Sequence, residues 1–208
     1  MRDGLNPLQL KEQLAKAFCM LGAFQWDPKD GFRLASGQVS PYYVDCRSLL
    51  AYPDTRRLIA ELAFHSMQAL DIHAIGGLEI GAIPMSTAIS DYAYQAIPQK
   101  EWRTFVVRKQ PKGHGLGKLI EGAAQSGDQA LILDDVLTSG GSLLKAVQAV
   151  REVGMLVSNA LVIVDRGEQT GRQNVEAEGI SVVGLLTLDD LKHMQRMLEA
   201  RAIPKDRP

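Results

Sequence analysis

The segment LILDDVLTSGGS, residues 131–142, decides the fold of this sequence. An apolar run is followed by two adjacent carboxylates, Asp134 and Asp135, and then by a loop of small polar residues and glycine that leads into a helical pattern. Continuous apolar runs are typical of strands that are buried on both faces of a parallel sheet. The segment therefore predicts a strand, a loop and a helix within an α/β fold.

The loop after the two acids has the composition of a phosphate-binding site. The first amide groups of a helix lack intrahelical partners, and the partial positive charge at this end favours an anion. Gly140 and Gly141 let backbone amides approach a phosphate closely. The hydroxyls of Thr138, Ser139 and Ser142 add further donors. Carboxylates beside such an anion are explained if they bind sugar hydroxyls or help to hold a cation on the ligand, so the segment predicts a ribose phosphate site.

Outward from this segment, the sequence alternates between strand and helix patterns. The predicted strands span residues 73–78, 104–108, 129–134, 156–164 and 180–186. The predicted helices span residues 7–22, 53–70, 80–95, 142–153, 168–178 and 188–201. Turn signals within residues 31–50 predict a hairpin or lid-like element instead. The pattern predicts an open parallel sheet, with ligands at the carboxyl ends of its strands.

The composition predicts one compact domain over residues 1–208. The chain is 46% hydrophobic and has 23 Lys and Arg against 24 Asp and Glu. This balance provides no global field for nucleic acid or an anionic membrane, so we expect neither as a partner. The sequence shows no apolar run of membrane-spanning length and no signal-peptide core, so we expect a cytoplasmic protein. Cys19 and Cys46 show no CxxC spacing, which argues against a disulfide framework.

A second candidate feature is a cationic loop between Arg103 and Lys118. It contains five basic residues, one histidine and no acid. Its glycine and proline content predicts a mobile loop instead of a helix. A loop of this kind suits a pyrophosphate leaving group, because its closure excludes water and brings positive charge to the oxygens on which negative charge develops.

The whole segment 131–142 resembles the phosphoribosyl pyrophosphate (PRPP) motif of the type I phosphoribosyltransferases. This resemblance implies an open, mainly parallel sheet flanked by helices, with a small N-terminal hood over about residues 1–50 and a core over about residues 51–208. It also implies that Asp134 and Asp135, as catalytic residues, contact the ribose 2′- and 3′-hydroxyls. The implied substrate-binding residues that follow them are Val136, Leu137, Thr138, Ser139, Gly140, Gly141 and Ser142, of which the last five hold the 5′-phosphate.

Within that family, RKQPKGHG, residues 108–115, resembles the catalytic loop of the orotate phosphoribosyltransferases. The resemblance implies a homodimer in which Lys112 and His114 act at the active site of the partner subunit. It also implies that Arg108 and Lys109 bind pyrophosphate. Gly113 stands where an aspartate is frequent in these enzymes.

Two further motifs are similar to the base-binding parts of the same enzymes. The segment FRLASGQVSPYYVD, residues 32–45, resembles their N-terminal signature and implies that Ser36, Tyr42 and Tyr43 line one wall of the base pocket. Arg166 follows a predicted strand and resembles the arginine that recognises orotate, since a guanidinium pairs well with a carboxylate.

The resemblance implies transfer of phosphoribose from PRPP to orotate, which gives orotidine 5′-monophosphate and pyrophosphate in de novo pyrimidine biosynthesis. Mg²⁺ is the implied cofactor, held mainly by the pyrophosphate of the substrate and by no assigned protein ligand. Two alternatives remain: transfer to another base, such as uracil or a purine, and a nucleotide-sensing regulator without catalysis. The cationic loop and Arg166 argue against the first, and the presence of Lys112 and His114 in that loop argues against the second. A Rossmann dehydrogenase is excluded, because no G-x-G-x-x-G opens a helix in a βαβ unit.

Overall fold

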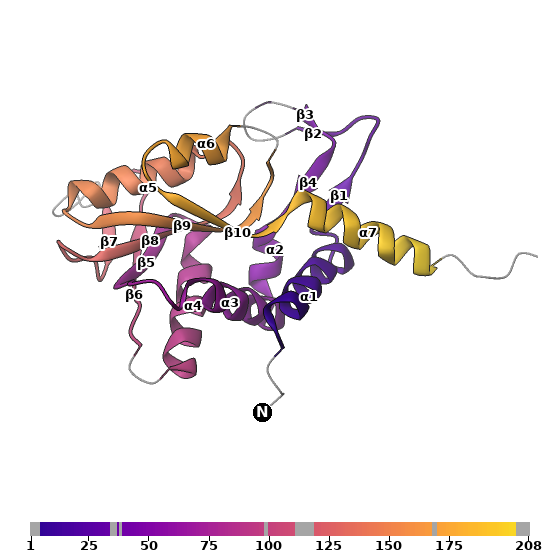
Figure 1. Cartoon of the computed structure of the whole chain (residues 1–208). Helices are drawn as coiled ribbons and strands as arrows, with labels where there is room; N and C mark the ends of the chain where they lie inside the picture. The colour runs from indigo at the N-terminus through magenta and orange to yellow at the C-terminus, as the bar shows by residue number, and fades with distance from the viewer. Residues whose placement is uncertain are drawn as a thin grey trace, which may run out of the picture.

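A computed structural model describes residues 5–33, 37, 39–97, 100–110, 119–167 and 170–202. These residues form a six-stranded sheet with the strand order β10-β9-β8-β5-β6-β7. All neighbouring strands in it run parallel except β6 and β7, which are antiparallel. The predicted α/β class, with an open and mainly parallel sheet flanked by helices, is confirmed (Figure 1).

The sheet strands are β5 (Ala74–Leu78), β6 (Arg103–Val107), β7 (Ile120–Gly122), β8 (Gln129–Leu137), β9 (Leu156–Asp165) and β10 (Ser181–Thr187). The helices are α1 (Pro7–Met20), α2 (Cys46–Ala51), α3 (Pro53–Met67), α4 (Ala82–Ala96), α5 (Gly141–Glu152), α6 (Gly171–Glu176) and α7 (Leu188–Ala202). Four short strands precede the sheet in sequence: β1 (Phe24–Trp26), β2 (Phe32–Arg33), β3 (Val39–Ser40) and β4 (Tyr42–Val44).

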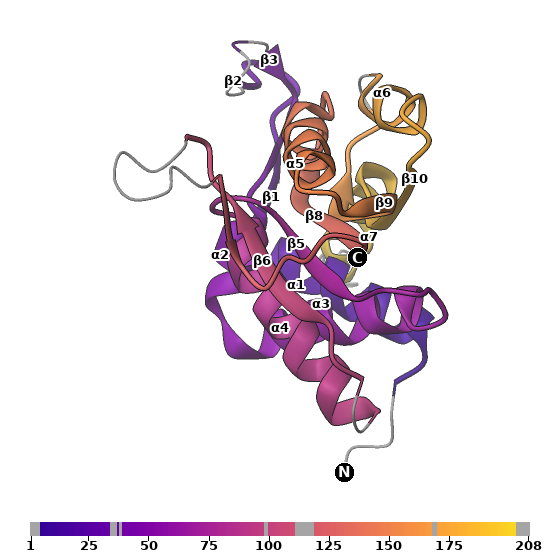
Figure 2. The ribbon, with the colours of Figure 1, turned by 90° about the vertical axis from the view of Figure 1, so that its left-hand side faces the viewer.

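Two hydrophobic cores cover the two faces of the sheet. On one face, α5 packs its buried stripe, which includes Leu143, Val147 and Val150, against β8 and β9. On the other face, α1, α3 and α4 contribute to the larger core, which also contains sheet side chains such as Leu133 and Leu161. Figure 2 shows these two helical layers on opposite sides of the strands. Burial from both sides explains why β8 and β9 read as continuous apolar runs.

The four short strands β1 to β4, which we call the hood strands, form two small antiparallel pairs. Strand β1 pairs with β4, and β2 pairs with β3. Figures 1 and 2 show the β2–β3 hairpin projecting from the body of the molecule. Two- and three-residue strands are too short to be stable alone, so the position of the hood strands depends on their contacts with the core.

The structure differs from the sequence prediction at one place that matters for the site. The strand that we predicted to end at Asp134 continues through both carboxylates to Leu137. The reason is its neighbour: β9 pairs with β8 as far as Asp165, so the ladder continues past the acidic residues. Short elements were also missed, namely β1, β7 and α2, because three to six residues carry little periodic signal.

Strands β5 and β6 approach each other closely at Gly76. A Cβ atom built there would lie 2.1 Å from the carbonyl oxygen of Phe105 and 2.7 Å from its ring. We therefore expect Gly76→Ala to lower the free energy of unfolding by about 3 kcal/mol or more, measured by urea denaturation. Gly22→Ala is the control: Gly22 has a φ of 66° but nothing within 4 Å of its Cβ position, so only about 1 kcal/mol of backbone strain is expected. Equal losses in the two variants would contradict this explanation.

Candidate functional site

The carboxyl ends of β5, β8 and β9 bring the predicted site residues to one edge of the sheet. Asp134 and Asp135 lie half-buried near the end of β8, and Arg166 follows β9 directly. The amide of Arg166 donates to the carbonyl oxygen of Leu137, 3.1 Å away, which ties the two strand ends together. This is the edge at which open α/β sheets bind ligands.

The Asp135 side chain lies against the backbone of Gly81, which has no side chain to exclude it. A Cβ atom at Gly81 would lie 2.9 Å from the carboxyl carbon of Asp135, so glycine leaves room for that carboxylate beside the start of α4. Behind it, the Cys46 thiol lies 3.5 Å from the backbone carbonyl oxygen of Asp135. Burial raises the pKa of this thiol well above its usual range, so it is neutral and donates its proton to the carbonyl group.

The close pair of acids changes the protonation of Asp134. Burial, followed by the charge of neighbouring Asp135, raises the pKa of Asp134 to about 8. The Asp134 carboxylate accepts a hydrogen bond from the amide of Asp135 at 3.0 Å, and this contact has the opposite effect. At neutral pH the pair therefore shares one proton and carries less than two negative charges.

The loop between β8 and α5, which we predict to bind phosphate, is partly open to solvent. Ser139, Gly141 and Ser142 are exposed, while Gly140 is buried at the start of α5. Gly140 has a φ of 81°, a left-handed conformation that glycine adopts without steric cost. The long, amphipathic α5 thus directs its amino-terminal end toward this exposed loop.

Helix α6 supports the loop from behind. A Cβ atom at Gly171 would lie 2.1 Å from the carbonyl oxygen of Thr138, so the two backbones are in direct contact. The Asn174 side chain donates to the carbonyl oxygen of Ser139 at 3.2 Å. Arg172 in turn binds the buried carboxylate of Asp165, with 2.8 Å between the charged atoms, and fixes α6 to the end of β9.

Arg166 is almost completely buried, with 6% of its surface exposed. Its guanidinium donates to the hydroxyl oxygen of Ser40 at 2.7 Å and to the backbone carbonyl oxygen of Tyr42 at 3.1 Å. Both acceptors belong to the hood strands. The predicted base-binding arginine therefore joins the end of β9 to the hood.

The side chains of Tyr42 and Tyr43, the predicted aromatic pair, point in opposite directions, because successive side chains of a strand lie on opposite faces. The ring of Tyr42 packs nearly parallel to Phe24, with 6.0 Å between the ring centres. The ring of Tyr43 contacts Phe32 of β2 at 5.6 Å. Tyr42 thus meets Arg166 through its backbone, and its ring lies against the core. Substrate contacts of both tyrosines stay predictions.

At the base of the cationic loop, the structure describes Arg108 and Lys109. The amide of Lys109 donates to the carboxylate of Glu79 at 2.9 Å, so the loop begins beside the turn that leads into α4. The Arg108 guanidinium lies 4.0 Å from the carboxylate of Glu121 on β7. Three other predicted site residues, Lys112, His114 and Ser36, lie outside the described residues.

Sequence reasoning did not select several residues that shape this site. Ser40 lies within residues 32–45, the segment that resembles the N-terminal signature, but 126 residues separate it from Arg166 and no contact between the two was predicted. Gly171 and Asn174 were part of a predicted helix with no sign of contact with the phosphate loop. Glycine followed by a polar residue at the start of a helix near a sheet edge is the one available signal, and it is weak.

The acidic residues of the site fit a ligand-borne cation better than a metal held by the protein alone. In the part of the chain that the structure describes, no three His, Cys, Asp or Glu side chains are grouped so that they could hold a metal ion. Asp134 and Asp135 offer adjacent carboxylate oxygens at the open sheet edge. Such oxygens suit sugar hydroxyls or the water shell of a Mg²⁺ ion, which keeps several waters in most protein sites.

The comparisons with known proteins assign the chain to a family. The sequence matches the phosphoribosyl transferase domain family over residues 47–183, so the chain belongs to the phosphoribosyltransferases. An orotate phosphoribosyltransferase of Aquifex aeolicus is 40% identical over 77% of this chain and 86% of its own length. Another, from Methanothermobacter thermautotrophicus, is 37% identical over 90% of this chain and 97% of its own length.

A solved structure supports the same assignment. The orotate phosphoribosyltransferase of Mycobacterium tuberculosis in complex with PRPP is 32% identical and superposes with a TM-score of 0.69, covering 88% of this chain and 99% of that one. The chain belongs to the orotate phosphoribosyltransferases, and the predicted family, enzyme class and activity are thereby confirmed. Among the described helices, none has the length and apolar character needed to cross a membrane.

The raised pKa of Asp134 gives a pH-dependent stability with a defined sign. Between its ordinary value near 4 and about 8, the folded protein holds a proton that the unfolded chain has lost, so stability falls as pH rises through this window. We expect Asp134→Asn to remove this fall. The free energy of unfolding of the variant minus that of the unmodified protein should therefore rise by on the order of 2 kcal/mol between pH 4 and pH 8, measured by urea denaturation.

Asp91→Asn on the exposed side of α4 is the matched control, because it removes one negative charge away from the site. Parallel stability curves for the Asp134→Asn variant and the unmodified protein would show that Asp134 is ionised in the folded state.

Proposed function

We propose that this orotate phosphoribosyltransferase binds PRPP at the edge formed by β8, the phosphate loop and α5. The strongest support is the continuous segment from Asp134 to Ser142, which presents two carboxylates and an exposed loop at a helix amino terminus in one place. The 5′-phosphate would accept hydrogen bonds from the loop amides and hydroxyls. The 2′- and 3′-hydroxyls of the ribose would donate to Asp134 and Asp135.

The binding of PRPP would change the charge of the acidic pair. A ribose hydroxyl donates best to an ionised carboxylate, so bound sugar favours loss of the proton that the pair shares in the free protein. Mg²⁺ bound to the pyrophosphate would supply positive charge that offsets both the acids and the leaving group. The bond that breaks joins C1′ of ribose to a pyrophosphate oxygen, and its electron pair leaves with pyrophosphate. The bond that forms joins C1′ to N1 of orotate, which releases its proton to solvent.

The protein would contribute position and charge to this reaction, without a covalent nucleophile. The phosphate loop and the acidic pair hold the ribose, which leaves C1′ free to move between leaving group and base. The cationic loop would stabilise the pyrophosphate with Lys112 and His114, next to Arg108 and Lys109 at its start. Closure of such a loop excludes water, which would otherwise compete with orotate for the ribosyl carbon.

Arg166 would select the base. It is buried at the end of β9 and is held by Ser40 and the Tyr42 carbonyl group, so its direction is fixed before a ligand arrives. A guanidinium pairs with the carboxylate of orotate, a group that uracil, hypoxanthine and adenine lack. Ser36 and Tyr43 would complete the wall of the base site.

A homodimer is the proposed assembly, with a loop from each subunit serving the site of the other. Exposed apolar side chains lie at both ends of α4: Ile80, which is 68% exposed, and Ile83 at its start, and Tyr94 and Ile97 at its end. Exposed apolar patches mark interaction sites. The first pair lies next to Gly81, which contacts Asp135, so a second copy seated on it would lie at the edge of the catalytic site.

The base assignment is tested by comparing orotate with uracil, hypoxanthine and adenine as acceptors. The unmodified protein should consume orotate in preference to all three. We expect Arg166→Gln to reduce kcat/KM for orotate by 100-fold or more, on the order of the loss for a buried charged pair, and to leave PRPP affinity within about twofold. Equal use of uracil by the unmodified protein, or an unchanged kcat/KM for orotate in the variant, would refute the assignment.

The loop in trans is tested by complementation between two inactive proteins. Lys112→Ala should lower turnover far more than the affinity for nucleotide product, because its charge acts on the leaving group. After this variant is mixed with Asp135→Asn, each heterodimer has one site with both groups intact. About a quarter of the unmodified activity should therefore return on random exchange of subunits. Absence of recovery in heterodimers proven by mass spectrometry would show that each loop serves its own subunit.

A further inference from the structure

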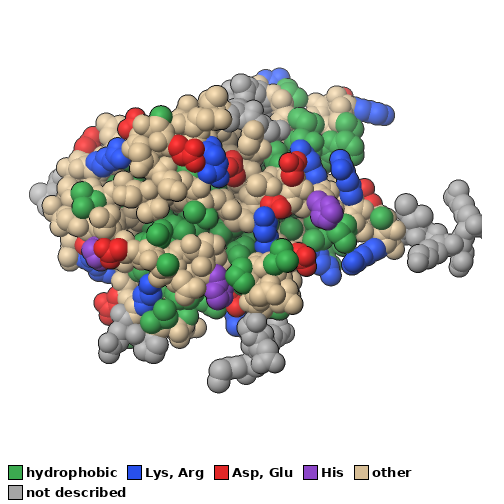
Figure 3. Space-filling model, in the orientation of Figure 1, with side chains coloured by type: hydrophobic (Ala, Val, Ile, Leu, Met, Phe, Trp, Pro, Cys, Tyr) green, Lys and Arg blue, Asp and Glu red, His purple; other side chains and the backbone are tan. Residues whose placement is uncertain are grey.

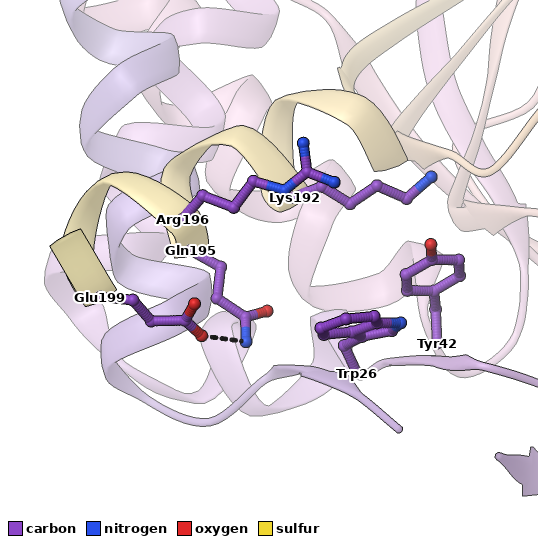
Figure 4. Close-up of a pocket in the computed structure, with 6 residues that line it drawn as sticks. All are labelled: Trp26, Tyr42, Lys192, Gln195, Arg196 and Glu199. Atoms are coloured by element: carbon purple, nitrogen blue, oxygen red, sulfur yellow. Dashed lines mark hydrogen bonds between the residues drawn. The ribbon is translucent and has the colours of Figure 1, made fainter. Parts of the chain in front are cut away.

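Helix α7 contacts the hood strands through Lys192, a residue with no role in the proposed reaction. Lys192 of α7 places its ammonium 4.5 Å from the centre of the Tyr42 ring. Figure 4 shows Lys192 and Arg196 extending from α7 above Tyr42 and Trp26 of the hood strands. The same ammonium lies 3.2 Å from the carboxylate of Asp189, one turn earlier on the helix, which restricts its position.

The cavity between α7 and the hood strands is too small to explain these contacts as a ligand site. It is lined by Trp26, Tyr42, Lys192, Gln195, Arg196 and Glu199 and has a volume of about 40 Å³. Sites for small organic ligands have volumes of several hundred Å³. Its polar groups also satisfy one another, since Gln195 donates to Glu199 at 2.8 Å. The contacts therefore hold two parts of the protein together.

Tyr42 links α7 to Arg166, the proposed base-binding residue, because its ring contacts one and its backbone contacts the other. The ring of Tyr42 faces Lys192 and Phe24, while its carbonyl oxygen accepts from the Arg166 guanidinium at 3.1 Å. Its amide also donates to the hydroxyl of Ser40 at 3.2 Å, the second acceptor of Arg166. A shift of the Tyr42 ring therefore moves both groups that orient the arginine.

The hood strands need such an external contact. Strand β4 has three residues and pairs only with three residues of β1 among the described strands. Helix α7, in contrast, is fixed to the body: Lys11 of α1 pairs with Asp190 at 2.9 Å, and Leu188 and Leu191 are buried in the larger core. The surface of the molecule over α7 in Figure 3 carries both basic and acidic side chains, so position and not net charge distinguishes Lys192.

We infer that Lys192 is a positioning residue for orotate: its ammonium holds the Tyr42 ring, and Tyr42 with Ser40 sets the direction of the Arg166 guanidinium. This inference rests on the proposed role of Arg166 in base recognition. PRPP lies outside its reach, because the phosphate loop and acidic pair make their contacts with α5, α6 and Gly81. Loss of the Lys192 cation should thus weaken the binding of orotate and leave the binding of PRPP unchanged.

The test compares Lys192→Met, which keeps the length of the side chain, with Lys192→Arg, which keeps the cation. We expect Lys192→Met to raise KM for orotate about fivefold, with kcat and the PRPP dissociation constant, measured by calorimetry without orotate, unchanged within twofold. Lys192→Arg should restore KM to within twofold of the unmodified value. Arg196→Met is the matched control, because it removes a cation one turn further along the same cavity.

Two results would overturn the inference. One is an unchanged KM for orotate in a Lys192→Met protein that unfolds at the same temperature as the unmodified one. The other is a Lys192→Arg variant as impaired as Lys192→Met. A double variant tests whether Lys192 acts through Arg166. If it does, adding Lys192→Met to Arg166→Gln should lower kcat/KM for orotate no further. If Arg166→Gln alone has no effect, the base assignment fails; if it has one and Lys192→Met does not, only the positioning role fails.

Discussion

The pairing of β8 with β9 beyond the apolar part of both strands is the constraint on which the site depends. The ladder continues to Leu137 and Asp165, so the two carboxylates of β8 are held by a sheet and not by a free loop. Two acids held side by side in partial burial repel each other, and a shared proton relieves that repulsion. The same extension delivers Arg166 to the position where the hood strands meet the sheet.

Each part of the proposed site is held in place by a neighbouring segment of the fold. The phosphate loop lies on the backbone of α6, the acidic pair lies beside a glycine of the turn before α4, and the buried arginine is directed by Ser40 and Tyr42. In all three, a group of the proposed site is oriented by a neighbouring segment of the fold. A site built in this way is organised before binding, which reduces the ordering cost that binding would otherwise carry.

Much of the fold and part of the site followed from the sequence, for physical reasons that can be named. The long elements have strong periodicity, and the phosphate loop is contiguous, so local chemistry was enough for both. The end of β8 was placed too early, because charge inside a strand is tolerated only when a neighbouring strand maintains the pairing. Ser40 and Lys192 were beyond reach, because their partners are distant in sequence and a single chain carries no signal for such contacts.

The contact between Lys192 and Tyr42 also has a consequence for biosynthesis. The hood strands are synthesised before α7, which follows about 150 residues later in the chain, at least roughly 8 s at ordinary rates of elongation. During that interval the nascent hood lacks the helix whose Lys192 contacts Tyr42. On the proposed roles of Asp134, Asp135 and Lys192, newly made protein would therefore have its PRPP-binding acids before the lysine that orients Arg166.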